Sequence, residues 1–431
     1  MPTRRRFLQG TAAAAPFVLG ACSPLLKNPP ASDDPDVLRV GLVGCGGRGT
    51  GAAYQAVNAE PGTIKLVAMG DVFADRLDSS YNHLQSSLGD TAQARMDVPE
   101  DRRFVGFDAY QKVIDSGVDV VVLTTPPHFR PEHIRAALAA DKHVFCEKPM
   151  AVDAPGVRSV MASAREAKQK NLALVSGFCW RKHYRYRSLY ERILEGGMGD
   201  LQVVYSTYNA SPLGTKPRQP GWSEMEFQLR NWQHMNWLGG DSLVEQACHS
   251  LDKMGWAFGD IQPLSCTAVG GRQARFGEER GDIFDHFAVT YDYPEGKRGF
   301  HMSRQMANCS TDNSDFAYGT KGRMTARPWA DLFIIEGESP WESDAPGNDM
   351  YQTEHNEMFA SIRAGNPVND GDFMTGSTML SVMGRLASYT GQTVTWEQAM
   401  ASTDRLGPEI YAFGSDVPEL IVPIPGRTRL V

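Results

Sequence analysis

The chain has 431 residues, of which 42% are hydrophobic and 22% charged, and its formal net charge is -8 at pH 7. This balance is typical of a globular protein and argues against nucleic acid or an anionic membrane surface as a partner, because both select basic patches. About 400 residues remain behind the N-terminal segment described next, a length that predicts two domains.

The N-terminal residues have the features of a removable export signal. Residues 3–9 (TRRRFLQ) match the twin-arginine pattern, and the apolar stretch from Thr11 to Leu19 is too short to span a membrane. Residues 19–22 (LGAC) resemble a lipobox, in which Cys22 becomes lipid-modified, and cleavage at an Ala-x-Ala-like site is the alternative. We interpret residues 1–22 as a signal peptide for the twin-arginine (Tat) translocase and the proline-rich residues 23–36 as a linker. The expected location is periplasmic, or lipid-anchored to a membrane that faces the periplasm.

From residue 37 to residue 179, apolar strands alternate with helical segments, which predicts an α/β domain with a doubly wound parallel sheet of the Rossmann type. The strands are predicted at Leu38–Val43, Ile64–Gly70, Val118–Thr124, His143–Cys146 and Leu172–Gly177. The helices are predicted at Gly51–Asn58, Ala74–Leu88, Tyr110–Ser116, Pro131–Ala140 and Ala154–Lys170.

Residues 180–431 predict a second, α+β domain with an open, mostly antiparallel sheet. A helix is expected at Tyr184–Glu195, followed by strands with period-two alternation at Leu201–Tyr208, Ile283–Asp292 and Gly299–Gln305, which look antiparallel. Helices at Glu354–Ala364 and Thr375–Thr390 follow near the C-terminus. We expect this domain to hold the substrate site and to join copies of the chain into a homo-oligomer through its sheet.

A glycine-rich turn follows the first strand. Residues 44–49 (GCGGRG) have the GxGxxG pattern: Gly44 permits the tight turn, Gly46 admits a diphosphate and Gly49 allows the helix to pack closely, with Gly47 and Arg48 beside them. Asp71 ends the next strand, where a carboxylate accepts hydrogen bonds from ribose hydroxyls and repels a 2′-phosphate. The pattern predicts a bound dinucleotide, NAD rather than NADP.

Two further motifs follow strands of the same sheet at their carboxyl ends, where cofactor and substrate meet in open α/β sheets. The first contains Thr125, Pro126 and His128. Of its two histidines, His128 is a better candidate than His133 to line the nicotinamide ribose. The second is Glu147-Lys148-Pro149, in which Lys148 would stabilise a developing alkoxide. An exposed strand end with a charge pair is the alternative interpretation of this second motif.

In the second domain, a helix that begins at Asp241 or Ser242 carries Glu245, His249, Asp252 and Trp256 on one face. The pattern predicts acid–base chemistry, with His249 as the proton carrier and Glu245 or Asp252 orienting it. A buried polar helix is the alternative. A metal is not expected, because Glu245 and His249 supply only two ligands.

Aromatic and polar side chains gather between Tyr205 and Gly240 in what we interpret as a long loop that approaches the site. A role in carbohydrate binding is predicted for Trp180, Arg181, Trp232, His234, Trp237 and Asp252. Core packing or an oligomer contact is the alternative. The six cysteines after Cys22 are widely spaced, and a protein that folds in the reducing cytoplasm is expected to keep them as free, buried thiols.

In combination, the Gly44–Gly49 fingerprint, Asp71, Glu147-Lys148-Pro149 and the Glu245–Asp252 stretch resemble the Gfo/Idh/MocA oxidoreductases, the family of glucose–fructose oxidoreductase and inositol dehydrogenase. The resemblance extends from about Leu38 to the C-terminus and implies sugar or cyclitol substrates, with Lys148 and His249 in the roles of the family's lysine and histidine. The acid four residues before the histidine is often Asp in the family, and here it is Glu245.

The predicted function is an exported NAD-dependent oxidoreductase that acts on a ring hydroxyl and retains its cofactor, because no soluble nicotinamide pool exists outside the cytoplasm. One alternative is a redox-neutral NAD-dependent glycoside hydrolase of the α-N-acetylgalactosaminidase type, which some related proteins are. A more remote alternative is a non-catalytic sugar-binding protein.

Overall fold

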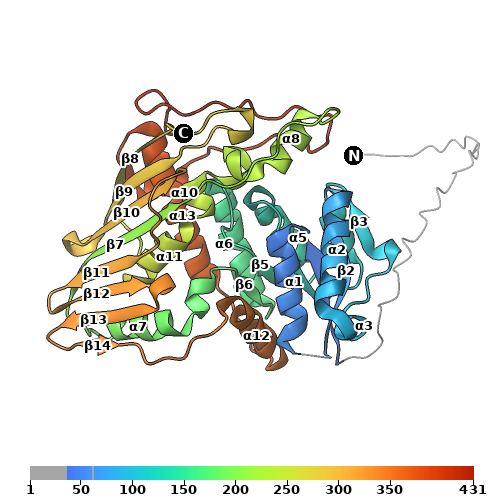
Figure 1. Cartoon of the computed structure of the whole chain (residues 1–431), viewed down its shortest axis with the longest axis horizontal. Coiled ribbons are helices and arrows are strands. Elements are labelled where there is room, and N and C mark those ends of the chain that lie inside the picture. Colours follow the sequence, from blue (N-terminus) through green and yellow to red (C-terminus); the bar gives the residue numbers. More distant parts are fainter. Residues whose placement is uncertain (1–35, 61–62) are drawn as a thin grey trace, which may run out of the picture.

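The computed structural model describes residues 36–60 and 63–431. The predicted signal peptide (1–22) and all of the predicted linker except Asp36 therefore lie outside the described residues. Figure 1 shows two sheets side by side, each with helices packed against it. Within the described ranges, no helix is both long and apolar enough to cross a bilayer.

The first sheet has six parallel strands in the order β3-β2-β1-β4-β5-β6. The strands are β1 (Leu38–Val43), β2 (Ile64–Asp71), β3 (Arg103–Val105), β4 (Val120–Leu123), β5 (His143–Cys146) and β6 (Leu174–Ser176). The helices of this part are α1 (Gly47–Ala59), α2 (Ala74–Leu88), α3 (Ala92–Arg95), α4 (Ala109–Asp115), α5 (Arg130–Ala139) and α6 (Ala154–Gln169). The predicted doubly wound domain is confirmed, with β3 as a short edge strand that the sequence pattern did not reveal.

Alternating residues of the central strands enter two separate cores, one on each face of this sheet. Val120 and Val122 of β4 pack in the core with α1 and α2, whereas Val121 and Leu123 pack in the core with α4, α5 and α6. Because both faces are covered, every β4 side chain is apolar and buried. Because helices cover both faces, a ligand would reach this sheet at the carboxyl ends of its strands.

The second sheet has nine strands in the order β14-β13-β12-β11-β7-β10-β9-β8-β15. Their bounds are β7 (Leu201–Ala210), β8 (Ser265–Gly271), β9 (His286–Asp292), β10 (Arg298–Gln305), β11 (Asp315–Gly319), β12 (Gly322–Arg327), β13 (Leu332–Gly337), β14 (Trp341–Glu342) and β15 (Val394–Thr395). All pairs are antiparallel except β7 and β10, which pair in parallel. The expectation that these two strands are antiparallel to their neighbours is wrong for this one pair, because the chain leaves β7 through helices before it returns to the sheet.

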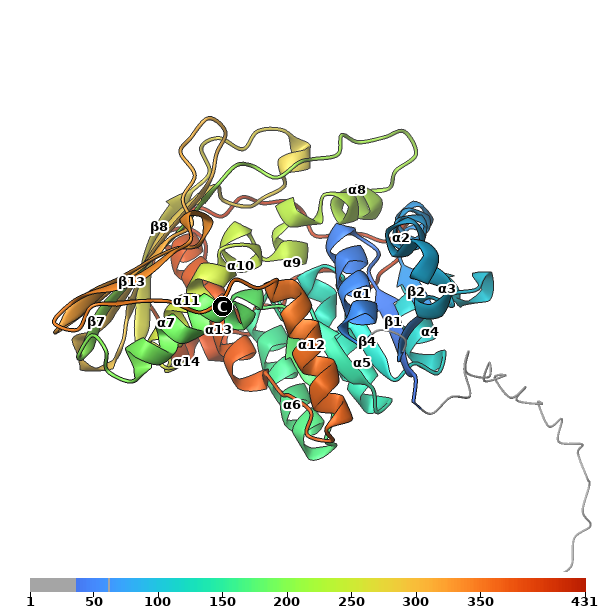
Figure 2. The same ribbon diagram turned by 60° about the horizontal axis from the view of Figure 1, so that its bottom comes forward.

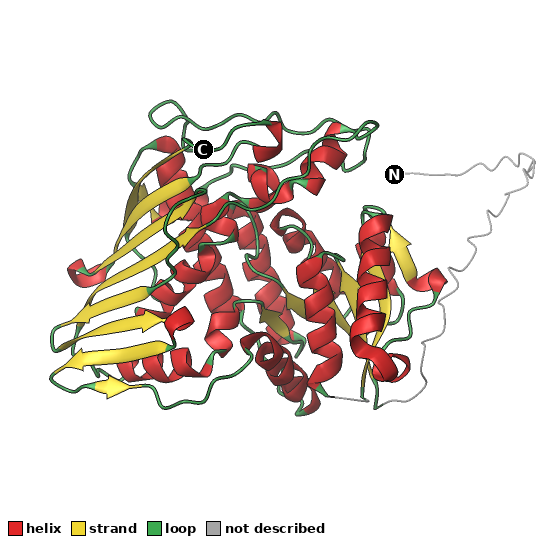
Figure 3. Cartoon of the chain, in the orientation of Figure 1, coloured by secondary structure: helices red, strands yellow, loops and turns green. Residues whose placement is uncertain are grey.

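Helices cover one face of the second sheet (Figure 3). They are α7 (Tyr184–Leu194), α11 (Cys248–Ala257) and α13 (Gly371–Thr390), with α14 (Trp396–Ala401) beside them. The segment predicted as one long loop between Tyr205 and Gly240 instead ends β7 and then forms α8 (Glu224–Arg230) and α9 (Asn236–Gly239). Residues 211–223 are the longest stretch without helix or strand there.

Helix α12 (Met350–Arg363) belongs by its packing to the first domain, although it follows the second sheet in the chain. Met358 and Phe359 lie in the core formed with α1 and β1, and Figure 2 shows α12 against α1. The next residues bridge to β6 through Leu174 and Asn369. The chain thus crosses between the two domains more than once.

The cysteine prediction is confirmed for five of the six described cysteines, which are free and buried. Cys309 is free but exposed, because it lies in the loop between β10 and β11.

Candidate active site

The glycine-rich turn has the geometry that the GxGxxG pattern predicts. Gly44 has a φ of +95°, and a Cβ there would lie 2.7 Å from the amide nitrogen of Thr125. A Cβ at Gly49 would clash with the carbonyl oxygen of Gly44, whereas at Gly47 it would meet nothing within 4 Å. Helix α1 begins here with Gly46 as its N-cap. Because glycine has no side chain, no side chain of the N-cap residue accepts from the first amide groups of the helix. The unobstructed helix N-terminus fits a diphosphate.

Asp71 ends β2 beside this turn and is held rigidly. Its Oδ2 accepts a hydrogen bond of 2.6 Å from the amide of Cys45, and its Oδ1 accepts one of 2.9 Å from the amide of Phe73. Burial raises the pKa of the Asp71 carboxyl, and these two hydrogen bonds oppose that shift. Each carboxylate oxygen keeps a second lone pair for a ribose hydroxyl.

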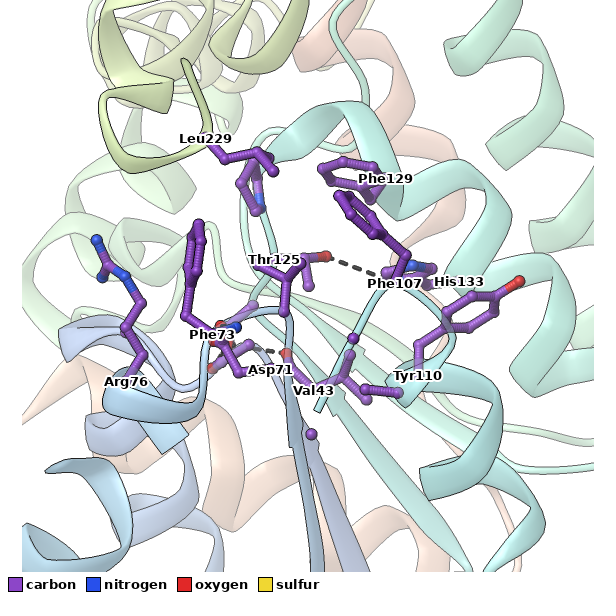
Figure 4. Close-up of a pocket in the computed structure, with 18 of the residues that line it drawn as sticks. Val43, Asp71, Phe73, Arg76, Phe107, Tyr110, Thr125, Phe129, His133 and Leu229 are labelled. Atoms are coloured by element: carbon purple, nitrogen blue, oxygen red, sulfur yellow. Dashed lines mark hydrogen bonds between the residues drawn. The ribbon is translucent and has the colours of Figure 1, made fainter. Parts of the chain in front are cut away.

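A pocket opens between Asp71 and the end of β4 (Figure 4). Its walls are strongly aromatic and include Val72, Phe73, Phe107, Tyr110, Thr125, Pro126, Phe129, His133, Leu229 and Trp232. Leu229 and Trp232 come from the second domain, so the pocket lies between the two domains. The structure thus places Thr125, Pro126 and Trp232 in this pocket together with Asp71.

His128 does not line this pocket, contrary to the prediction that it lines the cofactor site. Its Nε2 lies 2.7 Å from the hydroxyl of Tyr411, and its ring packs edge-on against Trp237 at a centroid distance of 5.0 Å. The short helical turn at Pro127–Phe129 directs the side chain toward the C-terminal residues. His133 lines the pocket instead, with its Nδ1 3.2 Å from the Thr125 hydroxyl.

Lys148 and Glu245 meet across the domain boundary. The Lys148 ammonium donates to the backbone carbonyl of Glu245 at 2.6 Å and lies 3.3 Å from its Oε1. Burial is the largest single influence and acts to lower the pKa of Lys148, but Glu245, Cys248, Glu147 and Tyr208 together outweigh it, and the pKa lies above its ordinary value. Lys148 is therefore a fixed cation at the end of β5.

The preceding residue, Glu147, connects this lysine to the glycine-rich turn. Its Oε1 lies 2.9 Å from Nε of Arg48, and its Oε2 accepts a hydrogen bond of 3.1 Å from the Lys148 amide. Arg48 and Glu147 were both predicted at the cofactor site, and the structure brings them together. The pair ties the first turn of α1 to the loop after β5.

Arg130 is a buried residue at this edge that the sequence analysis missed. Its Nη1 donates to the carbonyl of Pro149 at 2.6 Å and its Nε to the carbonyl of Thr125 at 2.9 Å. It thereby joins the two loops that carry Thr125 and Lys148. No sequence signal points to it, because both of its acceptors are backbone oxygens.

Glu245 and His249 lie on two short helices and not on one continuous helix. Helix α10 (Ser242–Glu245) ends where Gln246 leaves the regular helical path, and α11 begins at Cys248. The predicted face of four residues is therefore broken before His249. As a result Glu245 turns to Lys148 and does not orient the histidine.

His249 is held in its neutral form. Burial, and then the positive charges of Lys148 and Lys253, lower its pKa well below the usual value. Its ring packs edge-on against Phe178, and Nδ1 is buried with no hydrogen-bond partner among the described residues. His249 is therefore a neutral imidazole with a ring nitrogen that is unpartnered among these described residues, near the ammonium of Lys148.

Asp252 and Arg181 bind each other, and their predicted role in substrate binding stays a prediction. Asp252 accepts from Nε of Arg181 at 2.9 Å and from the hydroxyl of Ser377 at 2.7 Å, and Arg181 also pairs with Asp260. Trp180 is likewise buried in the core of the second domain, where it packs against Tyr186. These residues anchor α11 against α7 and α13.

Of the three remaining residues predicted to contact a carbohydrate, two are buried and one lines the pocket. Trp237 is buried and donates from Nε1 to Gln228 at 2.6 Å, so it belongs to the packing. His234 is also buried, with Nδ1 3.0 Å from Arg275 and Nε2 3.1 Å from the carbonyl of Gly214. Trp232 alone of these three lines the pocket beside Asp71.

A second cleft runs beside the glycine-rich turn. It is lined by residues of that turn, by Trp232 and His234, and by the basic side chains of Arg48, Arg76, Lys216 and Arg230.

In residues 36–60 and 63–431, no group of three or more His, Cys, Asp or Glu side chains is arranged to hold a metal ion.

Comparison with known proteins assigns the chain to a family. Residues 38–175 match the Gfo/Idh/MocA oxidoreductase family with its NAD-binding Rossmann fold, and residues 186–325 match the C-terminal domain of the same family. The chain therefore belongs to the Gfo/Idh/MocA oxidoreductases.

Relatives of known activity are distant. Trans-1,2-dihydrobenzene-1,2-diol dehydrogenase of Sus scrofa is 27% identical over 257 residues, which cover 57% of this chain and 68% of the relative. Inositol 2-dehydrogenase of Rhizobium meliloti is 23% identical over 256 residues, covering 59% and 70%. The chain is thus an oxidoreductase, and both of these relatives are dehydrogenases.

Solved structures share the fold over most of the chain. Aldose-aldose oxidoreductase from Caulobacter crescentus has a TM-score of 0.65 at 19% identity and covers 83% of this chain and 99% of its own. Levoglucosan dehydrogenase, solved with NADH and levoglucosan, has a TM-score of 0.65 at 17% identity, with coverage of 83% and 99%.

Proposed function

We propose that this oxidoreductase uses a tightly held NAD to oxidise or reduce a ring hydroxyl of a sugar or cyclitol. One observation carries the proposal: Lys148, a buried ammonium just after β5, lies close enough to His249 for its charge to lower the pKa of this buried, neutral imidazole. An alcohol that loses hydride needs both a base for its proton and a positive charge beside its oxygen.

The two residues divide this work by their charge. His249 is neutral because burial lowers its pKa, so it is ready to accept the hydroxyl proton in oxidation. Lys148 stays protonated because Glu245 and its other neighbours raise its pKa against the effect of burial, so it stabilises negative charge on the substrate oxygen. Glu245 acts on the reaction through Lys148, as a positioning residue.

The residues around the glycine-rich turn fit a dinucleotide. Gly46 and Gly47 would hold the diphosphate at the start of α1, and Asp71 would accept from the adenosine ribose hydroxyls. A carboxylate at this position supports NAD over NADP, since it repels a 2′-phosphate. When bound, the nicotinamide ring would accept or donate the hydride.

The names of the relatives support the substrate class. A dihydrobenzenediol, inositol and levoglucosan each carry hydroxyl groups on a six-membered ring, and Trp232 offers an aromatic face in the second cleft, beside the glycine-rich turn. A carbohydrate or cyclitol of this kind is the proposed small-molecule partner.

Two measurements on the purified protein test the proposal. Acid denaturation should release NAD or NADH at close to one equivalent per chain, and a panel of sugars and cyclitols should then change the 340 nm absorbance of the bound cofactor. A protein that neither carries nor binds a dinucleotide contradicts the proposal. Cleavage of an aryl glycoside, with solvent deuterium at C2 and no net change in NADH, would instead identify the redox-neutral glycosidase.

We also propose that the chain is exported in its folded state. The twin-arginine residues Arg4 and Arg5 and the lipobox at Cys22 support this location. Arg4→Lys with Arg5→Lys should retain the protein inside the cell, and Cys22→Ala should release it from the membrane fraction or leave the precursor uncut. A soluble wild-type protein whose mature N-terminus is another residue would contradict lipidation.

A further inference from the structure

The C-terminal residues 403–425 form a strap that joins the two domains. At its start the carbonyl of Ser402 accepts from Nη1 of Arg158 at 3.0 Å, and just past its end the amide of Gly426 donates to the carbonyl of Thr390 at 2.9 Å. Between these points the dark red segment crosses the top of the molecule toward α8 (Figure 1). Both ends are thus anchored outside the dinucleotide pocket.

The strap is fastened to the first domain by polar contacts. The amide of Leu406 donates to Asp153 at 2.9 Å, and the hydroxyl of Tyr411 lies 2.7 Å from Nε2 of His128. Gly407 passes so close to His128 that a Cβ there would clash with the imidazole ring. This packing explains why His128 faces the strap and not the pocket.

Two rings of the strap contact the aromatic wall of the pocket from behind. The ring of Phe413 lies 5.3 Å from that of Phe107 and 5.8 Å from that of Phe73, measured between centroids. The ring of Tyr411 lies 5.4 Å from Phe129 and 6.4 Å from Phe107. All three partners of these rings line the pocket, whereas Tyr411 and Phe413 do not.

The three wall residues need this support because each follows the end of a strand or a short turn, and none lies within a long element. Phe73 follows β2, Phe107 follows β3 and Phe129 ends the turn after β4. Side chains on such segments move unless other groups pack behind them. Figure 4 shows Phe73 on one side of the pocket and Phe107 with Phe129 on the other.

We propose that the strap is the device that retains the dinucleotide. By bracing Phe73, Phe107 and Phe129, Tyr411 and Phe413 keep the apolar walls closed around a flat base and slow its escape. This inference rests on the proposed function, because it concerns the same cofactor. Tyr411 and Phe413 act as positioning residues, since they hold the wall and do not touch the ligand.

The test compares two alanine variants of the full-length protein, one that removes a contact with the pocket wall and one that does not. Phe413→Ala removes a ring that is 37% exposed but contacts the wall, and Ile421→Ala removes a strap side chain that is 65% exposed and is outside the hydrophobic cluster formed around Phe73, Phe107 and Phe129. Each holoenzyme is mixed with excess unlabelled NAD, and the loss of bound isotope-labelled NAD is followed over time. The melting temperature and circular dichroism spectrum of each variant establish that it is folded.

Phe413→Ala should release NAD about tenfold faster than the wild type, equivalent to about 1.4 kcal/mol, and Ile421→Ala should match the wild type. Phe413→Leu, which keeps an apolar contact, should fall between them and serves if the alanine variant does not fold. Equal release rates for the wild type, Phe413→Ala and the double variant Tyr411→Leu/Phe413→Ala would overturn the strap proposal alone. A wild-type protein that binds no dinucleotide would overturn both proposals at once.

Discussion

The ammonium nitrogen of Lys148 lies 2.6 Å from the backbone carbonyl oxygen of Glu245, a residue 97 positions further along the chain. The contact joins the carboxyl end of β5 to the end of α10, and so it fixes the two domains relative to each other at the reacting centre. The nearby Oε1 of Glu245, at 3.3 Å, belongs to the charge that contributes most to raising the pKa of Lys148 against the effect of burial.

Glu245→Gln should therefore change the pH dependence of the reaction. Without the carboxylate, burial becomes the dominant influence and the pKa of Lys148 falls. We expect kcat to decrease about tenfold at neutral pH and its alkaline limb to move to lower pH, as general acid–base effects of this size allow. A pH profile of kcat measures both effects, and an unchanged alkaline limb would show that Glu245 has no influence on Lys148.

His249→Asn should lower kcat by about 10²- to 10⁴-fold, the usual contribution of a general base, without loss of bound NAD. His286 lies on β9 and lines neither of the two clefts beside the glycine-rich turn, and His286→Asn is the matched control. Steady-state kinetics together with the nucleotide content of each variant separate catalysis from cofactor binding. Comparable activity of the two variants would remove His249 from the mechanism.

Two glycine substitutions in the same turn should have opposite outcomes. Gly49→Ala places a methyl group against the carbonyl of Gly44, and this variant should no longer bind NAD. The space around Gly47 is open, so Gly47→Ala should still bind NAD. The expected destabilisation by Gly49→Ala is about 2 kcal/mol or more, in the range of steric overpacking. Urea unfolding and nucleotide content measure the difference, and normal NAD content in Gly49→Ala would contradict the assignment of the turn.

The stability of the fold should depend on pH through His355. Burial lowers the pKa of this imidazole to about 3, and both ring nitrogens lack partners within the described part of the chain. Because the unfolded chain binds the proton near pH 6.5, the stabilisation is present above that pH and is lost as the pH falls toward the folded value.

His355→Met should flatten this dependence by about 1.4 kcal/mol per pH unit between pH 6.5 and 3.5, the effect of one proton. Stability at pH 7 should change little, because no hydrogen bond is lost. Urea unfolding at pH 7 and pH 4.5 measures the difference. Identical slopes for the wild type and the variant would mean that His355 does not bind a proton on unfolding.

The uncovered face of the second sheet should hold copies of the chain together. Val269 on β8 and Met302 on β10 are 71% and 49% exposed there, and they lie in register on either side of Ala288 of β9, so the two large apolar side chains share one patch of the sheet. The double variant Val269→Glu/Met302→Glu should reduce the mass measured by light scattering to that of a smaller assembly. A wild-type protein that is monomeric at micromolar concentration would contradict the expected homo-oligomer.

The elements of the first domain could be predicted from the sequence because each depends on contacts close in the chain. The bounds of β1, β5 and α2 agree with the predicted Leu38–Val43, His143–Cys146 and Ala74–Leu88. The glycine-rich turn could also be predicted from the sequence, since its constraints are steric and involve Gly44 and Gly49 within six residues. Short-range patterns of apolar and glycine residues record this information directly.

Only the tertiary structure decided the partners of the site residues. A helical repeat places Glu245 and His249 on one face, but α10 ends at Glu245, where Lys148 from the other domain attracts the carboxylate. Asp252 has the same spacing as a catalytic acid and is bound to Arg181 instead. Periodicity along one helix carries no information about charges that approach from other elements.

The sequence by itself thus determined the two-domain architecture, the dinucleotide turn and the identity of Lys148 and His249 as candidates. Tertiary structure decided that β7 and β10 pair in parallel, that α12 returns to the first domain, and that Tyr411 and Phe413 brace the pocket. Each of these features joins segments far apart in the chain. Their free energy comes from packing and charge between distant residues, which no local pattern encodes.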